Sequence, residues 1–109
     1  MVYIKGSKRQ PIEITRGDSE IFQVSIDLNG EEYTPQEGDK VCFAMKKSSG
    51  ICLLRKDVPI DTMQFVFDPE DTKYLPFGRY EYDMKITFAD GRVKTFVRLS
   101  PFIIGEEVN

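Results

Sequence analysis

The chain contains one long run in which polar and apolar residues alternate without a break, from Arg79 to Phe88. Successive side chains of a β-strand point to opposite faces, so the apolar residues of such a run share one face. That face carries Tyr80, Tyr82, Met84, Ile86 and Phe88. A strand with one buried and one solvated face is typical of an antiparallel sheet. The run therefore favours an all-β protein.

Shorter alternating segments, separated by turn residues, continue this pattern and predict strands near 12–14, 20–28, 39–47, 51–55, 63–67 and 92–104. Asp68 and Pro69 predict the start of one short corner helix near 69–75, which Pro76 ends. About seven strands with one such helix predict an immunoglobulin-like antiparallel β-sandwich. We expect a single domain, 1–109, with its core at about 12–104 and short flexible termini, including a frayed tail at 106–109.

Two dipeptides predict tight hairpins. Asn29-Gly30 suits a two-residue type I′ turn, which places Ile26 opposite Tyr33 on the buried side. For Asp90-Gly91 we also predict a two-residue turn rather than a three-residue loop, so that Phe88 faces Val93. In that register the outer face pairs Asp83 with Arg98, and Lys85 with Phe96. Arg16-Gly17-Asp18 is interpreted as a turn between the first two strands rather than as an adhesion motif.

The totals exclude several kinds of chemistry. The 109 residues carry 18 acids and 15 bases, a net charge of −3, which gives no general attraction for nucleic acid or an anionic membrane. There is no His, so the commonest general base and metal ligand are missing. Cys42 and Cys52 form no Cys-x-x-Cys pair and are expected to be free thiols. Neither a signal peptide nor a spanning segment is evident, which predicts synthesis and retention in the cytoplasm.

The acidic residues Asp68, Glu70 and Asp71 suit helix capping better than a calcium loop, whose spacing they lack. Catalytic residues, cofactors and metal sites are therefore all predicted to be absent, and we expect a protein that is not an enzyme. Tyr80 follows Pro76 and Gly78 at the start of the long strand. This spacing is typical of the tyrosine corner, in which a Tyr hydroxyl bonds upstream backbone, and it makes Tyr80 a structural residue.

One strand face is a candidate for contact with a partner. Arg92, Lys94, Phe96 and Arg98 alternate along the closing strand and mix basic groups with an aromatic ring. Single-strand nucleic-acid platforms share this composition, but one aromatic ring makes a thin stacking surface. A solvated strand face is the plainest interpretation, and protein–protein contact is the main alternative, because an exposed Phe beside Arg is typical of interfaces.

Three segments together resemble a known family. They are Ile14-Thr15-Arg16-Gly17-Asp18-Ser19, Asn29-Gly30 leading to Tyr33, and Asp71-Thr72 through Leu75-Pro76-x-Gly78-x-Tyr80-x-Tyr82-Asp83, followed by Ile86, Asp90-Gly91 and Phe102. This arrangement resembles small immunoglobulin-like proteins of phages and prophages of Gram-positive bacteria. It is also similar to the N-terminal domain of baseplate upper proteins. The likeness spans about 12–104.

The resemblance implies a structural role, in which the domain docks onto other virion or phage-encoded proteins in a tail, baseplate or neck. It carries over no catalytic residues. Because the sequence ends soon after the sandwich, without a stalk or receptor-binding module, an adaptor or accessory protein is expected rather than one that recognises the host. A homo-oligomer remains open. The alternative is a small-ligand or carbohydrate-binding module, which the lack of Trp makes less favoured.

Overall fold

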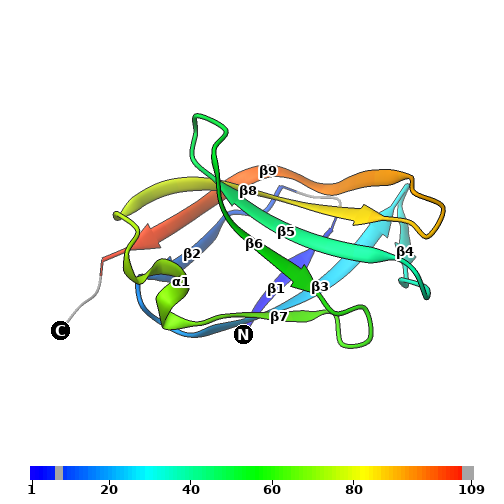
Figure 1. Ribbon diagram of the computed structural model, residues 1–109, viewed down its shortest axis with the longest axis horizontal. Helices are drawn as coiled ribbons and strands as arrows, with labels where there is room; N and C mark the ends of the chain where they lie inside the picture. Colours follow the sequence, from blue (N-terminus) through cyan, green and yellow to red (C-terminus); the bar gives the residue numbers. More distant parts are fainter. Residues whose placement is uncertain (7–8, 107–109) are drawn as a thin grey trace.

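The computed structural model, which describes residues 1–6 and 9–106, has two β-sheets packed face to face and one short helix at a corner (Figure 1). This confirms the predicted β-sandwich. The elements in chain order are β1 Val2–Lys5, β2 Ile12–Thr15, β3 Glu20–Leu28, β4 Glu31–Tyr33, β5 Lys40–Lys46, β6 Cys52–Val58, β7 Gln64–Phe67, α1 Pro69–Lys73, β8 Gly78–Thr87 and β9 Val93–Gly105.

The two sheets differ in size and connectivity. In the smaller sheet, β1, β3 and β4 are neighbours in that order, and β7 also pairs with β3. The larger sheet has the order β2-β9-β8-β5-β6. The two longest strands, β8 and β9, therefore lie side by side in the larger sheet, and β2 and β6 form its edges.

The start of the chain departs from the prediction. The described residues form nine strands rather than about seven, and β1 belongs to the sandwich: Ile4 is fully buried, so the core begins well before residue 12. Both β1–β3 and β2–β9 pair in parallel, so the sheets are not purely antiparallel. A run as short as β1 carries too little alternation to predict a strand. Of the tail predicted at 106–109, all but Glu106 lies outside the described residues.

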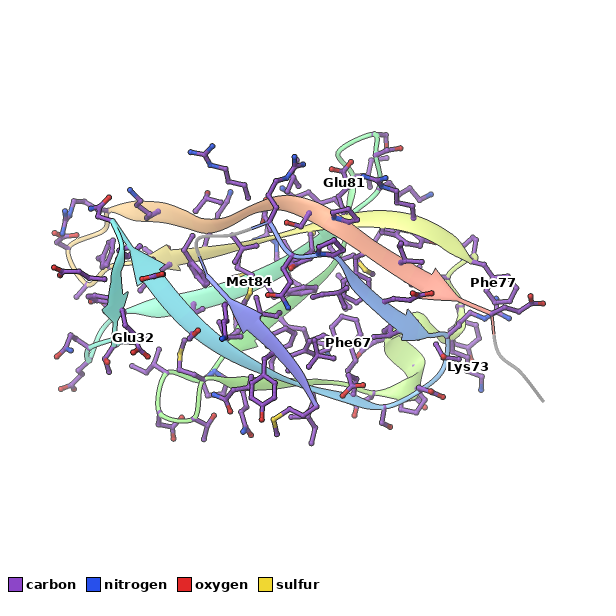
Figure 2. The ribbon with its side chains drawn as sticks, turned by 180° about the vertical axis from the view of Figure 1, so that it is seen from behind. Glu32, Phe67, Lys73, Phe77, Glu81 and Met84 are labelled. Carbon is purple, nitrogen blue, oxygen red and sulfur yellow. The ribbon has the colours of Figure 1, made fainter. Side chains whose placement is uncertain are left out.

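Aromatic rings fill the space between the sheets. Phe43 is fully buried, and its ring lies 5.0–6.4 Å, centroid to centroid, from five others. These five are Phe22, Phe65, Phe67, Tyr82 and Phe102. Figure 2 shows Phe67 and Met84 between the layers, whereas Glu81 lies on the outer face of the larger sheet. The aromatic core is thus contributed by both sheets.

Two of the predicted local structures are confirmed. Asn29 and Gly30 have φ of 55° and 83°, and Ile26 lies opposite Tyr33, as expected of a two-residue turn. The helix begins at Pro69, and the Asp71 carboxylate accepts the backbone N–H of Asp68 at 2.8 Å. That contact gives the acid of the first turn the capping role that the sequence predicts.

A buried carboxylate joins the β4–β5 loop to the β8–β9 hairpin. Asp39 accepts hydrogen bonds from the Tyr33 hydroxyl at 2.6 Å and from the backbone N–H groups of Gln36 at 2.9 Å and Ala89 at 3.0 Å. The bond from Tyr33, followed by the two backbone bonds, holds the pKa of Asp39 below its ordinary value of 3.8. Asp39 thereby fixes the position of the hairpin from which β9 starts.

We expect Asp39→Asn to remove a pH-dependent part of the stability. A lowered folded-state pKa contributes stability that is present above pH 3.8 and is lost as the pH falls below it. The melting temperature of Asp39→Asn should therefore lie below that of the wild type at pH 7, and the gap should narrow below pH 3.8. Thermal melts between pH 7 and pH 2.5 test this. A gap that stays constant over that range would contradict the assignment.

Candidate functional site

A groove of about 300 Å³ opens between the two sheets at one side of the sandwich. Strand β9 supplies one wall, the end of β3 and its turn supply the other, and the β1–β2 connection adds one residue. We call it the basic groove, and define it by the residues Arg9, Asp27, Leu28, Asn29, Lys94, Thr95, Phe96 and Arg98. Three of the four predicted contact residues, Lys94, Phe96 and Arg98, therefore line one site.

The β8–β9 hairpin, however, has a different register from the predicted one. The Phe88 N–H donates to the Arg92 carbonyl at 2.8 Å, so the loop has three residues and Phe88 does not face Val93. Gly91 has φ of 92°, and its N–H donates to the Phe88 carbonyl at 2.9 Å. A tight turn followed by a left-handed glycine is the usual three-residue hairpin loop, and it excludes the two-residue turn.

This register moves Lys94 to the other face of the strand. Lys94 lies opposite Ile86, whose side chain is fully buried, so Lys94 is on the inner side of the sheet. Because it lies near the end of the sandwich, its side chain is still exposed. Val93, by contrast, lies opposite Thr87 and is exposed on the outer face. The prediction that Lys94 lies on the outer face of the sheet is therefore wrong.

Phe96 is buried rather than exposed, with 4% of its surface accessible. The register changes between the pairs Lys85–Thr95 and Met84–Val97, so Phe96 is an extra residue in β9, a β-bulge. The bulge turns Phe96 toward the interior and removes the predicted pair of Lys85 with Phe96. A Cβ added at Gly6 would lie 2.5 Å from the Phe96 ring, so the ring packs against a site that only glycine fits.

The charges of the basic groove are predominantly positive. Arg9, Lys94 and Arg98 contribute three cations, and Asp27 is the one acid in the lining. The Arg9 Nε donates to the Leu99 carbonyl at 2.9 Å, which ties the β1–β2 connection to β9.

The predicted Asp83–Arg98 pair does not form, because a second register shift in β9 lies there and Asp83 pairs with Lys46 at 3.0 Å. Within residues 1–6 and 9–106, no carboxylate forms an ion pair with Lys94 or Arg98.

Arg92 is separate from the basic groove. Its Nε bonds the Asp90 carboxylate at 2.8 Å, and its guanidinium lies 5.1 Å from the centre of the Phe88 ring. The backbone and side-chain hydrogen bonds from Arg92 lower the pKa of Asp90. Arg92 therefore stabilises the hairpin loop. The sequence did not indicate Arg9, which lies outside every predicted strand. It did not indicate Asp27 either, because the alternation over 20–28 gives the face of Asp27 but not that β9 lies beside it.

Tyr80 makes the contact that its spacing predicts. Its hydroxyl donates to the Pro76 carbonyl at 2.7 Å, and burial raises its pKa. The neighbouring Tyr82 hydroxyl donates to the Gln10 carbonyl at 2.6 Å, and burial raises its pKa to about 12. Both hydroxyls thus bond backbone carbonyls, and neither tyrosine lines the basic groove.

Two other surfaces expose apolar side chains. At the α1 end of the sandwich, the guanidinium of Arg16 lies 4.0 Å from the centre of the Phe77 ring, and Lys73 lies at the same end (Figure 2). Tyr74, which follows Lys73 in the chain, is also exposed. The outer face of the smaller sheet carries a second group, which consists of Met1, Tyr3, Ile21 and Val66. The exposed aromatic residues are thus Tyr3 on the smaller sheet and Tyr74 and Phe77 at the α1 end.

The described part of the chain has neither a metal-binding cluster nor a membrane-spanning helix. There, no three His, Cys, Asp or Glu residues lie close enough together to hold a metal ion. Its helix is far too short to cross a membrane.

No protein-family model matches the chain, and no curated protein matches it. The chain is similar to the crystal structure of CopC from Methylosinus trichosporium OB3b, with a TM-score of 0.44 and 11% identity. The match covers 99% of this chain and 86% of that one. A likeness this distant supports no statement about a site or an activity.

Proposed function

We propose that this protein is a non-enzymatic structural or assembly protein of a phage or prophage, which binds another virion protein through the basic groove. One observation supports the basic groove as the contact site: Arg9, Lys94 and Arg98 line it together with a single acid, Asp27. The phage context rests on the sequence resemblance over about 12–104. Tail, baseplate or neck proteins are therefore the partners to test first.

The groove suits a negatively charged protein surface for a physical reason. Like charges held near one another repel, and an acidic partner relieves this repulsion while it steers the encounter. Lys94 and Arg98 lie on a strand that is hydrogen-bonded to β8, so their backbones are already fixed before a partner binds. Fixed positions reduce the entropy lost on binding.

Lys94→Glu is expected to weaken incorporation into particles by about tenfold or more, because it converts an attraction in the groove into a repulsion. Tagged wild type, Lys94→Glu and the control Lys47→Glu would be expressed in the source strain, and prophages induced. Mass spectrometry of sedimented particles then gives the copies of each chain per particle. Lys47 lies in the exposed β5–β6 turn, so the control makes the same charge change far from the groove.

The result separates the two parts of the proposal. Wild-type chain absent from the particles, yet abundant in the soluble lysate, would overturn the virion role. Equal incorporation of Lys94→Glu and Lys47→Glu would instead overturn the basic groove as the contact site.

The second candidate function is binding of a small ligand or carbohydrate at the α1 end. It rests on one observation, the exposed rings of Tyr74 and Phe77, which are 79% and 45% accessible. Exposed aromatic faces can stack on a flat ligand. A glycan array tests this function. Hits that disappear in Tyr74→Ala would favour it, and an array without hits would count against it.

A further inference from the structure

One edge of the larger sheet is open beside the basic groove. Strand β9 pairs with β8 along most of its length, but on its other side β2 covers only the segment from Phe102 to Gly105. Over residues 1–6 and 9–106, no strand pairs with Val93–Thr95 on that side. The groove lies against this segment, because Lys94 and Thr95 contribute to its lining.

The register fixes which backbone groups point into the open side. The Phe88 N–H bonds the Arg92 carbonyl, so these two residues form a hydrogen-bonded pair. Hydrogen-bonded and non-bonded pairs alternate along an antiparallel ladder. The next pairs with β8, at Val93 and Thr95, are therefore non-bonded ones. Their N–H and C=O groups point away from β8, to the open side of β9.

Two other sheet edges are protected. At β1, the Gln10 carboxamide accepts the Lys5 N–H at 3.2 Å and donates to the Tyr3 carbonyl, so a side chain occupies the outward backbone groups. At β6, Lys56 turns inward across the sandwich to the Asp71 carboxylate of α1, 2.8 Å away. Inward-pointing charges and covered edges prevent unwanted strand pairing. At Val93–Thr95, no side chain covers the outward backbone groups within the described residues; the inward-facing Lys94 and the bulge at Phe96 disfavour a neutral strand there, but an acidic strand would neutralise Lys94.

We propose that this edge binds an extended, acidic segment of the partner protein, which adds a strand to the larger sheet in line with β2. The inference rests on the proposed function of the basic groove and names the form of its ligand. Main-chain bonds to Val93 and Thr95 would supply the pairing. Carboxylates of the segment would meet Lys94, Arg98 and Arg9. Strand addition of this kind is a common mode of peptide recognition.

The test uses hydrogen exchange at single backbone amides, with a synthetic nine-residue peptide of alternating glutamate and valine as the probe. With the peptide at about ten times its Kd, exchange at Val93 and Thr95 should slow by about tenfold, because only the free fraction exchanges. Exchange at Lys94 should not change, because its N–H already points toward β8. Ser49, in the β5–β6 turn, is a remote control. A lysine–valine peptide of the same length should not bind.

Each outcome has a distinct meaning. If the peptide binds to the wild type and not to Lys94→Glu, but exchange at Val93 and Thr95 is unchanged, strand addition is overturned while the groove stands. If it binds both proteins equally, or does not bind at all, both the groove and the strand are overturned. If oligothymidine binds the groove and displaces the peptide at lower concentration, the occupant is nucleic acid and the proposal of a protein segment fails.

Discussion

Phe43→Ala is expected to lower the free energy of unfolding by about 3–5 kcal/mol, the range for removing a large aromatic side chain from a packed core. Phe43 is fully buried, and its ring packs against those of five neighbours from both sheets. Its removal leaves a cavity at the centre of the sandwich that the rigid strands cannot close. A domain of this size has about 5–15 kcal/mol of stability in total, so the loss is a large share of it.

Urea denaturation followed by circular dichroism measures the loss. Phe77→Ala is the matched control: it removes the same side chain, but Phe77 is 45% accessible and its ring contacts Arg16 at the rim. The control should cost much less than Phe43→Ala. Similar losses for the two variants would mean that the core is not centred on Phe43.

The two Gly-containing hairpins show how far turn chemistry can be predicted. Asn29-Gly30 formed the expected two-residue turn, because asparagine tolerates positive φ and Asn29 adopts 55°. At Asp90-Gly91 only the glycine has positive φ. The Asp90 carboxylate instead accepts the Arg92 backbone N–H at 3.0 Å, which stabilises the three-residue loop. The dipeptide predicted a hairpin correctly, but it did not determine the loop length.

The one extra residue in this loop determines which side chains of β9 line the basic groove. The alternation in β8 was correct, so its buried face was predicted correctly, with Met84 and Ile86 inside. In β9 the longer loop and the bulge at Phe96 break the alternation, and pattern reasoning assigned Lys94 and Phe96 to the wrong face. A bulge leaves no signal in a single sequence, since it depends on how the two strands fit. The groove itself joins β3 to β9 across the sandwich, which no local pattern predicts.

Lys46→Met is expected to lower the free energy of unfolding by about 2–3 kcal/mol. The Lys46 ammonium lies 3.0 Å from the Asp83 carboxylate, and the two side chains are 24% and 9% accessible. Removal of the lysine leaves a nearly buried carboxylate without its cation. Breaking a fully buried pair costs about 3–5 kcal/mol, and the partial exposure of Lys46 reduces this cost. Urea denaturation at pH 7 provides the measurement.

The double variant Lys46→Met, Asp83→Leu distinguishes an unpaired charge from a loss of packing. If the cost of Lys46→Met comes from the buried Asp83 carboxylate that has lost its cation, replacing Asp83 as well should restore stability to within about 1 kcal/mol of the wild type. If it comes from lost contacts of the lysine stem, the double variant should be no more stable than the single one. Arg92→Met is the control, because the Arg92–Asp90 pair is 75% and 57% accessible and its loss should cost far less. If Arg92→Met lost as much stability as Lys46→Met, the cost of breaking an ion pair in this protein would not depend on its burial, which would contradict the explanation given for Lys46→Met.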